Sequence, residues 1–252
     1  DATKHLFKYN IALDSWSKLS DAPDTWALGS DIVSDGKGTL YAVRGRSTPI
    51  LWSYDVSSDT WNDTLPNLPD FQIYTTNGHP LEYVGESYGD PEVCTQGCLF
   101  AFRGNNNRQF FRFDIAENQW YDATTIPSAL GGVHYGSSMA YDSTNGNIYA
   151  FRGYNSDDFF KYDVDTETWD SSLTDTADAP AEVYGGGSLL FLNDYIYAIR
   201  GNNSTDFWRY DIANDHWDSI STPSNVGNNG EDGLMVYVPN GSKCSDSEGC
   251  LF

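Results

Sequence analysis

A 22-residue pattern recurs along this chain and limits its fold more than any other feature. Residues 196–217 read IYAIRGNNSTDFWRYDIANDHW, and residues 148–169 read IYAFRGYNSDDFFKYDVDTETW. The pattern returns at 40–61 and 99–120, while residues 5–16 contain only its second half. A repeat of this kind is the mark of a structure built from stacked copies of one unit. The 252-residue chain is therefore predicted to be one domain of repeated units.

Within each unit the side chains alternate, which predicts β-strands. In IYAIRG, Tyr197 and Ile199 face one way, while Ala198 and Arg200 face the other. Short turns such as DGKG at 35–38 join the strand-like runs. Four short antiparallel strands in a unit of about 45–50 residues are typical of one blade of a β-propeller.

The two ends of the chain are predicted to complete one blade together. After Trp217 come the strand-like GLMVYV at 233–238 and CLF at 250–252, which matches the CLF at 98–100. The missing half of this unit is what residues 5–16 supply. We therefore expect an all-β, five-bladed β-propeller of four-stranded antiparallel blades, closed by N- and C-terminal strands that share one blade. The expected blades of this single domain (1–252) are approximately 29–61, 78–120, 136–169, 187–217, and 233–252 with 5–16.

Each complete unit also has a strand that ends in Arg-Gly, followed by a spaced aromatic-Asp pair and a Trp. The Arg-Gly pairs are Arg44-Gly45, Arg103-Gly104, Arg152-Gly153 and Arg200-Gly201, and the aromatic pairs are Tyr54-Asp55, Phe113-Asp114, Tyr162-Asp163 and Tyr210-Asp211, with Tyr9-Asn10 as a variant. This order resembles the kelch repeat, which implies a propeller. Arginine stands where the kelch repeat has its first glycine, and kelch propellers usually have six or seven blades. The resemblance implies a fold and not a function, because propellers host many activities.

The charge of the chain excludes some classes of partner. There are 36 acidic and 14 basic residues, which give a formal net charge of −22 at pH 7. Such a surface repels nucleic acid and anionic lipid and attracts cations. No apolar run approaches the roughly 18 residues that a membrane-spanning helix needs. We expect no nucleic-acid partner and no membrane insertion. Because the chain opens on Asp1 and stops inside a predicted strand, we also expect it to be a piece of a longer protein.

The four cysteines fall in two close pairs, Cys94 with Cys98 and Cys244 with Cys250. Neither pair has a histidine nearby, and the spacings differ from those of zinc sites. Two local disulfides, and hence an oxidising compartment, are expected instead. The sequence also contains candidate glycosylation sites at Asn62, Asn202, Asn203 and Asn240. These features predict a secreted or cell-surface location.

The repeated arginines are followed by an aspartate at a fixed spacing of 11 residues. A salt bridge between them is rejected, because the two positions lie at opposite ends of a strand, roughly 15–20 Å apart. The aspartates are interpreted as turn formers that accept backbone hydrogen bonds before each Trp. Asn10 is expected to do the same in the incomplete unit.

The arginines are expected to lie on one face, beside loops rich in aromatic residues. The candidate binding residues are Arg44, Arg103, Arg152, Arg200, Trp26, Tyr74, His134, Tyr135 and Tyr184. Guanidinium groups and aromatic rings on one concave face could hold acidic sugars, sulfated glycans or a partner's carboxylates. The alternative is structural, with each arginine bonding backbone carbonyls and stacking on an aromatic ring. The identity of the arginine in four units favours the structural alternative, since binding sites more often break the symmetry of a repeat.

Signals for cofactors and catalysis are weaker. The stretch 142–147 is interpreted as a hairpin turn and not as a calcium loop, although acidic loops at 175–182 and 228–233 could bind Ca²⁺ weakly. No other cofactor, no metal site and no catalytic residue is assigned. Carboxylates expected on or near first strands are Asp31, Glu82, Glu182, Glu231 and Asp232, and no spacing singles out a pair. A lyase would need a base such as His134 or Tyr135 beside Arg152.

The sequence thus favours a secreted or cell-surface, non-catalytic propeller module for binding or assembly. Its expected partner is a glycan or an extracellular protein, and further domains or copies of the same chain are further candidates. It could belong to a longer adhesive, matrix or filament protein. The alternative is a carbohydrate-active enzyme, a polysaccharide lyase or glycosidase, with its site in the central funnel.

Overall fold

A computed structural model of the chain shows an all-β protein. It describes residues 3–10, 12–27, 29–45, 48–69, 81–85, 94–170, 176–201, 204–222, 235, 237–238 and 250–251. Across these ranges all regular secondary structure is β-strand. Within the same ranges there is no helix long and apolar enough to cross a membrane.

Four antiparallel sheets of four strands each make up most of the molecule. The first contains β3 (Asp31–Ser34), β4 (Thr39–Gly45), β5 (Thr48–Asp55) and β6 (Thr60–Asn62). The second contains β7 (Leu81–Val84), β8 (Cys98–Phe102), β9 (Phe110–Asp114) and β10 (Gln119–Ala123). The third contains β11 (Ser138–Asp142), β12 (Asn147–Phe151), β13 (Phe159–Asp163) and β14 (Thr168–Trp169). The fourth contains β15 (Ser188–Leu192), β16 (Tyr195–Ile199), β17 (Phe207–Asp211) and β18 (His216–Ile220).

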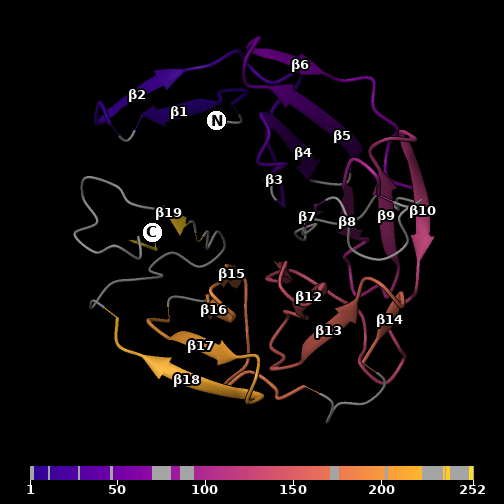
Figure 1. Cartoon of the computed structure of the whole chain (residues 1–252), viewed down its shortest axis with the longest axis vertical. Helices are drawn as coiled ribbons and strands as arrows, with labels where there is room; N and C mark the ends of the chain where they lie inside the picture. The colour runs from indigo at the N-terminus through magenta and orange to yellow at the C-terminus, as the bar shows by residue number, and fades with distance from the viewer. Residues whose placement is uncertain are drawn as a thin grey trace.

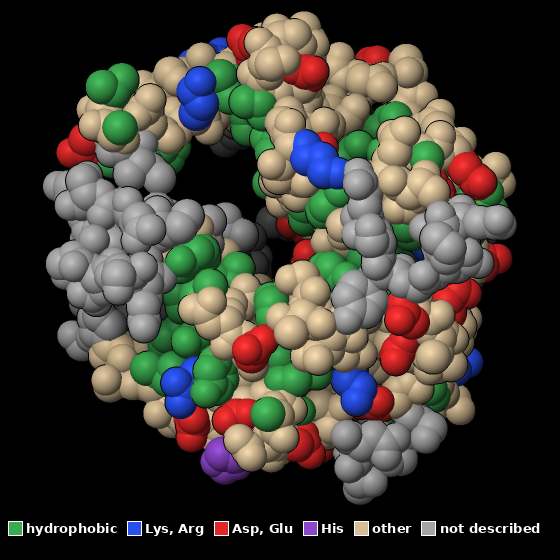
Figure 2. Space-filling model, viewed as in Figure 1, with side chains coloured by type: hydrophobic (Ala, Val, Ile, Leu, Met, Phe, Trp, Pro, Cys, Tyr) green, Lys and Arg blue, Asp and Glu red, His purple; other side chains and the backbone are tan. Residues whose placement is uncertain are grey.

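The four sheets are arranged around a common centre. In each sheet the strands follow one another in chain order, with the first strand innermost and the last outermost (Figure 1). Neighbouring sheets touch through their innermost strands, since β7 contacts β3 and β11, and β11 contacts β15. Figure 2 shows the opening that remains at the centre of this arrangement. The architecture is compatible with the expected propeller.

The two chain ends form two further hairpins. β1 (Phe7–Asn10) pairs with β2 (Ser15–Lys18), and β19 (Tyr237–Val238) pairs with β20 (Cys250–Leu251). In the described residues each pair is a separate two-stranded sheet, although both occupy the part of the ring between the first and fourth sheets (Figure 1). Their union in one four-stranded blade therefore stays a prediction.

The core lies between neighbouring sheets and is largely aromatic. Trp169 of the third sheet stacks on Phe102 of the second, with ring centroids 5.8 Å apart. Trp217 of the fourth sheet stacks in the same way on Phe151 of the third, at 5.9 Å. Burial of one such side chain contributes about 1.5–3 kcal/mol. Adjacent sheets therefore stabilise one another through the aromatic positions of the repeat.

The repeated tryptophans also join neighbouring sheets by hydrogen bonds, which we call the outer junctions. Each indole Nε1 donates to a backbone carbonyl in the segment that follows the last strand of the preceding unit. The bonds are Trp61 to Ser20 (3.0 Å), Trp120 to Pro66 (2.9 Å), Trp169 to Thr124 (2.6 Å) and Trp217 to Ala177 (3.0 Å). Since Ser20 follows β2, the β1–β2 hairpin adjoins the first sheet in the way that one complete sheet adjoins the next.

The prediction that the repeated aspartates form turns is confirmed. Their Oδ1 atoms accept backbone N–H bonds from residues two or three positions later: Asp55 from Ser57 and Ser58, Asp114 from Glu117, Asp163 from Thr166, and Asp211 from Asn214. Asn10 accepts the same bond from Leu13 at 3.0 Å. Each of these five turns closes a hairpin in which the repeated aromatic residue lies directly opposite the repeated Trp, as Tyr9 lies opposite Trp16.

Candidate functional site

Three of the repeated arginines bond backbone carbonyls on the loops that enter the first strand of their own sheet. Arg44 Nε donates to Thr25 O at 3.0 Å. The corresponding bonds are Arg152 Nε to Gly132 O at 3.1 Å and Arg200 Nε to Glu182 O at 2.8 Å. The arginines therefore hold these entry loops in place.

Each arginine also has a polar partner that the sequence analysis missed. Arg152 Nη1 lies 2.8 Å from Asp158 Oδ2, and Arg200 Nη1 lies 2.9 Å from Asp206 Oδ2. Arg103 bonds Gln109. In the sequence these partners are visible as an acid or amide six residues after the arginine. The prediction considered only the aspartate 11 residues after it.

The first sheet departs from this pattern because Ile50 occupies the sixth position, and Arg44 pairs with Asp24 at 3.0 Å. These contacts satisfy the guanidinium groups within the protein. They favour the structural interpretation of the arginines over a ring that binds anions.

The predicted aromatic residues separate into two groups. Trp26 lies against Trp52 and Trp61, with ring centroids 5.6 and 5.8 Å away, and its Nε1 donates to His5 O. It therefore packs at the junction between the β1–β2 hairpin and the first sheet. Tyr74 lies outside the described residues. The remaining three lie together on the entry loops of the third and fourth sheets.

These three residues form a cluster with Tyr154, which the sequence analysis did not name. We call His134, Tyr135, Tyr154 and Tyr184 the aromatic patch. The ring of Tyr154 lies 4.2 Å from His134 and 5.2 Å from Tyr135, centroid to centroid. Tyr184 is on the adjoining loop, where an added Cβ at Gly136 would lie 2.0 Å from its carbonyl oxygen. Tyr154 is 52% exposed, so the patch opens to solvent.

Tyr154 has a backbone conformation that suits its position in the repeat but not its side chain. Its φ is 55°, in the left-handed region, and the corresponding Asn105 of the second sheet has the same φ. Asparagine tolerates this region well, whereas a bulky side chain there is an outlier that costs of order 1 kcal/mol or more. Tyr135 likewise aligns with Gly185 of the next sheet. The patch breaks the symmetry of the repeat at both positions.

The surroundings of the imidazole in the patch disfavour its charged form. Partial burial, and then the charge of Arg152, lower the pKa of His134. At the other side of the patch, Tyr184 Oη donates to Glu182 Oε2 at 2.8 Å, and the Arg200 guanidinium lies 5.6 Å from the Tyr184 ring centroid. The patch thus offers ring faces beside carboxylates.

A second cluster lies on the innermost strands β3 and β7. Asp31 Oδ2 accepts the Leu81 N–H at 2.7 Å, so its carboxyl lies one peptide away from Glu82. Ser138 plays the same part between β11 and β15, where its Oγ accepts the Leu189 N–H at 3.0 Å. We call these contacts between innermost strands the inner junctions. The inner junction of the first and second sheets carries a carboxylate, whereas that of the third and fourth sheets carries a hydroxyl.

The surroundings of these two carboxyls favour their protonated forms. Burial raises the pKa of Asp31 to about 6. Burial, and then the charge of Asp31, raise the pKa of Glu82 to about 8. The sequence analysis named both residues but did not pair them, because only the fold brings β3 and β7 together. Of its other carboxylates, Glu182 is in the patch region, and Glu231 and Asp232 lie outside the described residues.

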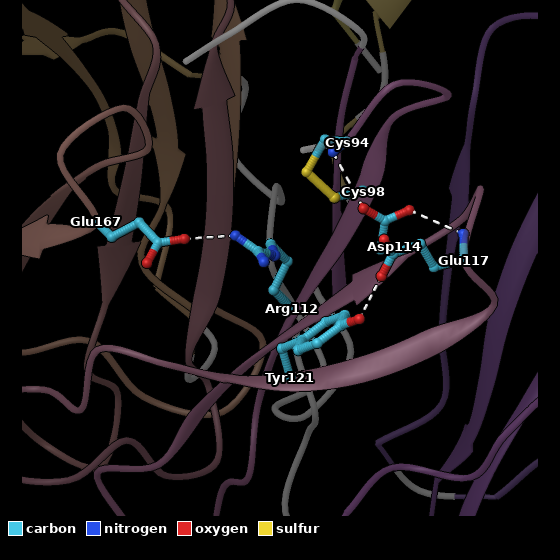
Figure 3. The surroundings of a disulfide bond; sticks show 7 residues. All are labelled: Cys94, Cys98, Arg112, Asp114, Glu117, Tyr121 and Glu167. Atoms are coloured by element: carbon cyan, nitrogen blue, oxygen red, sulfur yellow. Dashed lines mark hydrogen bonds and ion pairs between the residues drawn. A yellow bond between two sulfur atoms is a disulfide. The ribbon is translucent and has the colours of Figure 1, made fainter. Parts of the chain in front are cut away.

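Cys94 and Cys98 form the predicted disulfide, with their Cα atoms 5.1 Å apart (Figure 3). Asp114 Oδ2 accepts the Cys94 N–H at 3.1 Å, which ties the disulfide loop to β9. In the described part of the chain, these three residues are also the group with metal-type ligand atoms close together, but both sulfur atoms are committed to the disulfide. Cys250 is disulfide-bonded as well, and its expected partner Cys244 lies outside the described residues.

The remaining candidates are surface features. Asn62 is exposed at the end of β6, while Asn202, Asn203 and Asn240 lie outside the described residues. The stretch 142–147 is the predicted turn, in which Asp142 Oδ1 accepts the N–H groups of Thr144 and Asn145.

Comparison with known proteins adds no family: the sequence matches no protein-family model and no curated protein. The function is therefore argued from the geometry.

Proposed function

We propose that this chain is a secreted or cell-surface binding module of the kelch type that recognises carbohydrate through the aromatic patch. One observation carries the proposal: an exposed tyrosine occupies a left-handed position where the second sheet has asparagine, and it packs there with two further rings. Sugar rings present apolar C–H faces that stack on such side chains, and exposed apolar patches mark interaction sites.

The proposal includes a closed ring of five blades. The β1–β2 hairpin has the aromatic residues of a blade, and Trp61 joins it to the first sheet by the same outer junction as in the complete sheets. A blade that lacks its two inner strands needs them from elsewhere, and the β19–β20 pair lies in the same part of the arrangement, between the first and fourth sheets (Figure 1). Closure of this kind removes exposed sheet edges.

The proposed location rests on cysteine chemistry and on one sequon. A disulfide as local as Cys94–Cys98 persists in oxidising compartments and is rare in reducing ones. Asn62 adds an exposed glycosylation sequon. A module of this kind would suit a longer adhesive, matrix or filament protein.

A glycan array with three protein samples tests the binding function. Wild type is compared with Tyr154→Asn, which restores the residue of the second sheet, and with Phe7→Asn, which removes an aromatic of similar exposure on β1. Tyr154 is 52% exposed and Phe7 is 51% exposed, so the two variants remove comparable surfaces. We expect Tyr154→Asn to lose at least tenfold in affinity and Phe7→Asn to bind as wild type does. Absence of binding by all three samples, or equal binding by all three, would contradict the proposal.

A second candidate function, a carbohydrate-active enzyme with its site in the central funnel, is favoured by Asp31 and Glu82. A carboxyl such as that of Glu82, with its pKa raised to about 8, is protonated at neutral pH and could act as a general acid. Release of reducing sugar from a polysaccharide panel by wild type, but not by Glu82→Gln, would replace binding with catalysis as the function. Loss of that activity in Tyr154→Asn alone would assign it to the patch.

A further inference from the structure

The aromatic patch continues into a short ladder of backbone hydrogen bonds with acidic side chains along it. Asn155 N–H donates to Val183 O, Val183 N–H donates to Ser156 O, and Ala179 N–H donates to Asp157 O, at 3.0, 2.8 and 2.9 Å. The ladder joins the loop of Tyr154 to the segment that leads into Tyr184. A ligand stacked on the patch therefore has an ordered surface to extend along.

The far end of this ladder is acidic. Partial burial, and then the charges of Asp157 and Asp158, raise the pKa of Asp178. Asp178 therefore lies close enough to Asp157 and Asp158 for both charges to act on it. Asp158 is compensated by Arg152, at 2.8 Å, but the structure gives Asp157 and Asp178 no ion pair within the described residues.

The cations on these loops are already engaged. Arg152 is held by Asp158 and Gly132, and Arg200 is held by Asp206 and the Glu182 carbonyl. Glu182 has an exposed side chain and accepts a hydrogen bond from Tyr184. The loops around the patch thus carry two guanidinium groups and five carboxylates, those of Asp157, Asp158, Asp178, Glu182 and Asp206.

We propose that the patch and its ladder bind a chain of protonated amino sugars. Tyrosine faces attract cations as well as apolar C–H groups, and a bound ammonium group would relieve the repulsion among the carboxylates. A uronate or sulfated chain would meet the same carboxylates unfavourably. The inference rests on the proposed carbohydrate-binding function and adds the charge of the ligand to it.

Titration calorimetry with two oligosaccharides of equal length tests the inference. One is a fully deacetylated glucosamine oligomer, and the other is its N-acetylated form, both at mildly acidic pH and low salt. We expect wild type to bind the deacetylated oligomer at least tenfold more tightly, and the preference to shrink as salt screens it. Asp157→Asn with Asp178→Asn should remove most of the preference but leave binding of the acetylated oligomer intact.

A matched double variant controls for the overall negative charge of the protein. Asp122→Asn with Asp165→Asn removes two exposed carboxylates elsewhere and should keep the wild-type preference. Equal affinity for the two oligomers, or tighter binding of the acetylated one, would overturn this inference and leave the proposed function standing. Equal loss of preference in both double variants would also overturn it. If no oligosaccharide bound at all, the inference and the proposed function would fail together.

Discussion

The β1–β2 and β17–β18 hairpins have the same sequence pattern and very different surroundings. In both, an Asn or Asp forms the turn, and a tyrosine hydroxyl donates to an aspartate five residues later. Trp217 of β18 is 8% exposed, whereas Trp16 of β2 is 70% exposed. Tyr210 and Tyr9 differ in the same direction, at 3% and 39%.

The difference shows which properties of a blade are local. The turn and the cross-strand pair follow from a dozen residues, so they form in either hairpin. Burial comes from the preceding sheet: Trp217 packs on Phe151 and Phe159, with ring centroids 5.9 and 4.9 Å away, and bonds Ala177. The stability of the repeat therefore depends on the junctions between units, and the following predictions test those junctions.

The largest effect is expected from truncating the two tryptophans. Trp217→Ala should lower the free energy of unfolding by about 3–5 kcal/mol, because it empties a packed aromatic site. Trp16→Ala should cost less than about 1 kcal/mol, because the Trp16 ring is 70% exposed. Urea denaturation of both variants measures this. A cost for Trp16→Ala close to that for Trp217→Ala would contradict this prediction and show that a neighbouring sheet covers the Trp16 ring.

The inner junctions predict a pH dependence of stability. The pKa of Asp31 is raised to about 6 and that of Glu82 to about 8 in the folded protein, so the folded state binds more protons than the unfolded state between about pH 4 and 8. The stability from these two groups is fully present below about pH 4 and is lost as the pH rises through 6 and 8. Glu82→Gln should therefore stabilise the protein at about pH 9, by about 1–3 kcal/mol, and have little effect at about pH 4.

Asp165→Asn is the control for this pH series, because it removes an exposed carboxylate from an outer turn. Denaturation curves at the two pH values should show a smaller pH dependence in Glu82→Gln than in the control. The same pH dependence in both variants would contradict the assignment to the inner junction.

The outer junction of the β1–β2 hairpin predicts a smaller and more local effect. Trp61→Phe removes the indole N–H that donates to Ser20 O and should cost about 1 kcal/mol. Amide hydrogen exchange in β1 and β2 should accelerate, because this bond holds the hairpin to the first sheet. Trp120→Phe removes the matching bond to Pro66 and should leave exchange in β1 and β2 unchanged. Equal exchange in the two variants would show that the hairpin is held by other contacts.

The repeat in the sequence predicted the sheets well, because alternation and turn residues act within one unit. The turn role of Asp211 and the disulfide of Cys94 with Cys98 were predicted for the same reason. The partners across units were not, because they depend on which loops the fold brings together.

Two particular residues show why the candidate site was only half predicted. Arg152 was examined against an aspartate 11 residues later, while its partner Asp158 lies six residues later in a loop that folds back. Tyr154 was not named from the sequence, although the asparagines at the matching positions, Asn105 and Asn202, mark it as the exception. Its packing on His134 becomes visible only with the entry loop in place.

The smallest predicted effect separates a binding residue from a structural one. Tyr154→Asn relieves the strain of a left-handed tyrosine but also removes the ring contacts with His134 and Tyr135. We expect the relief of strain to be the larger effect, so the free energy of unfolding should rise by about 0.5 kcal/mol. The reverse exchange in the second sheet, Asn105→Tyr, should lower it by a similar amount, because φ is 55° at both positions. Thermal denaturation of the two variants measures the pair. A loss of stability in Tyr154→Asn would make the patch a packing feature, whereas a gain in stability together with a loss of glycan affinity is expected where a strained side chain is kept for its ligand.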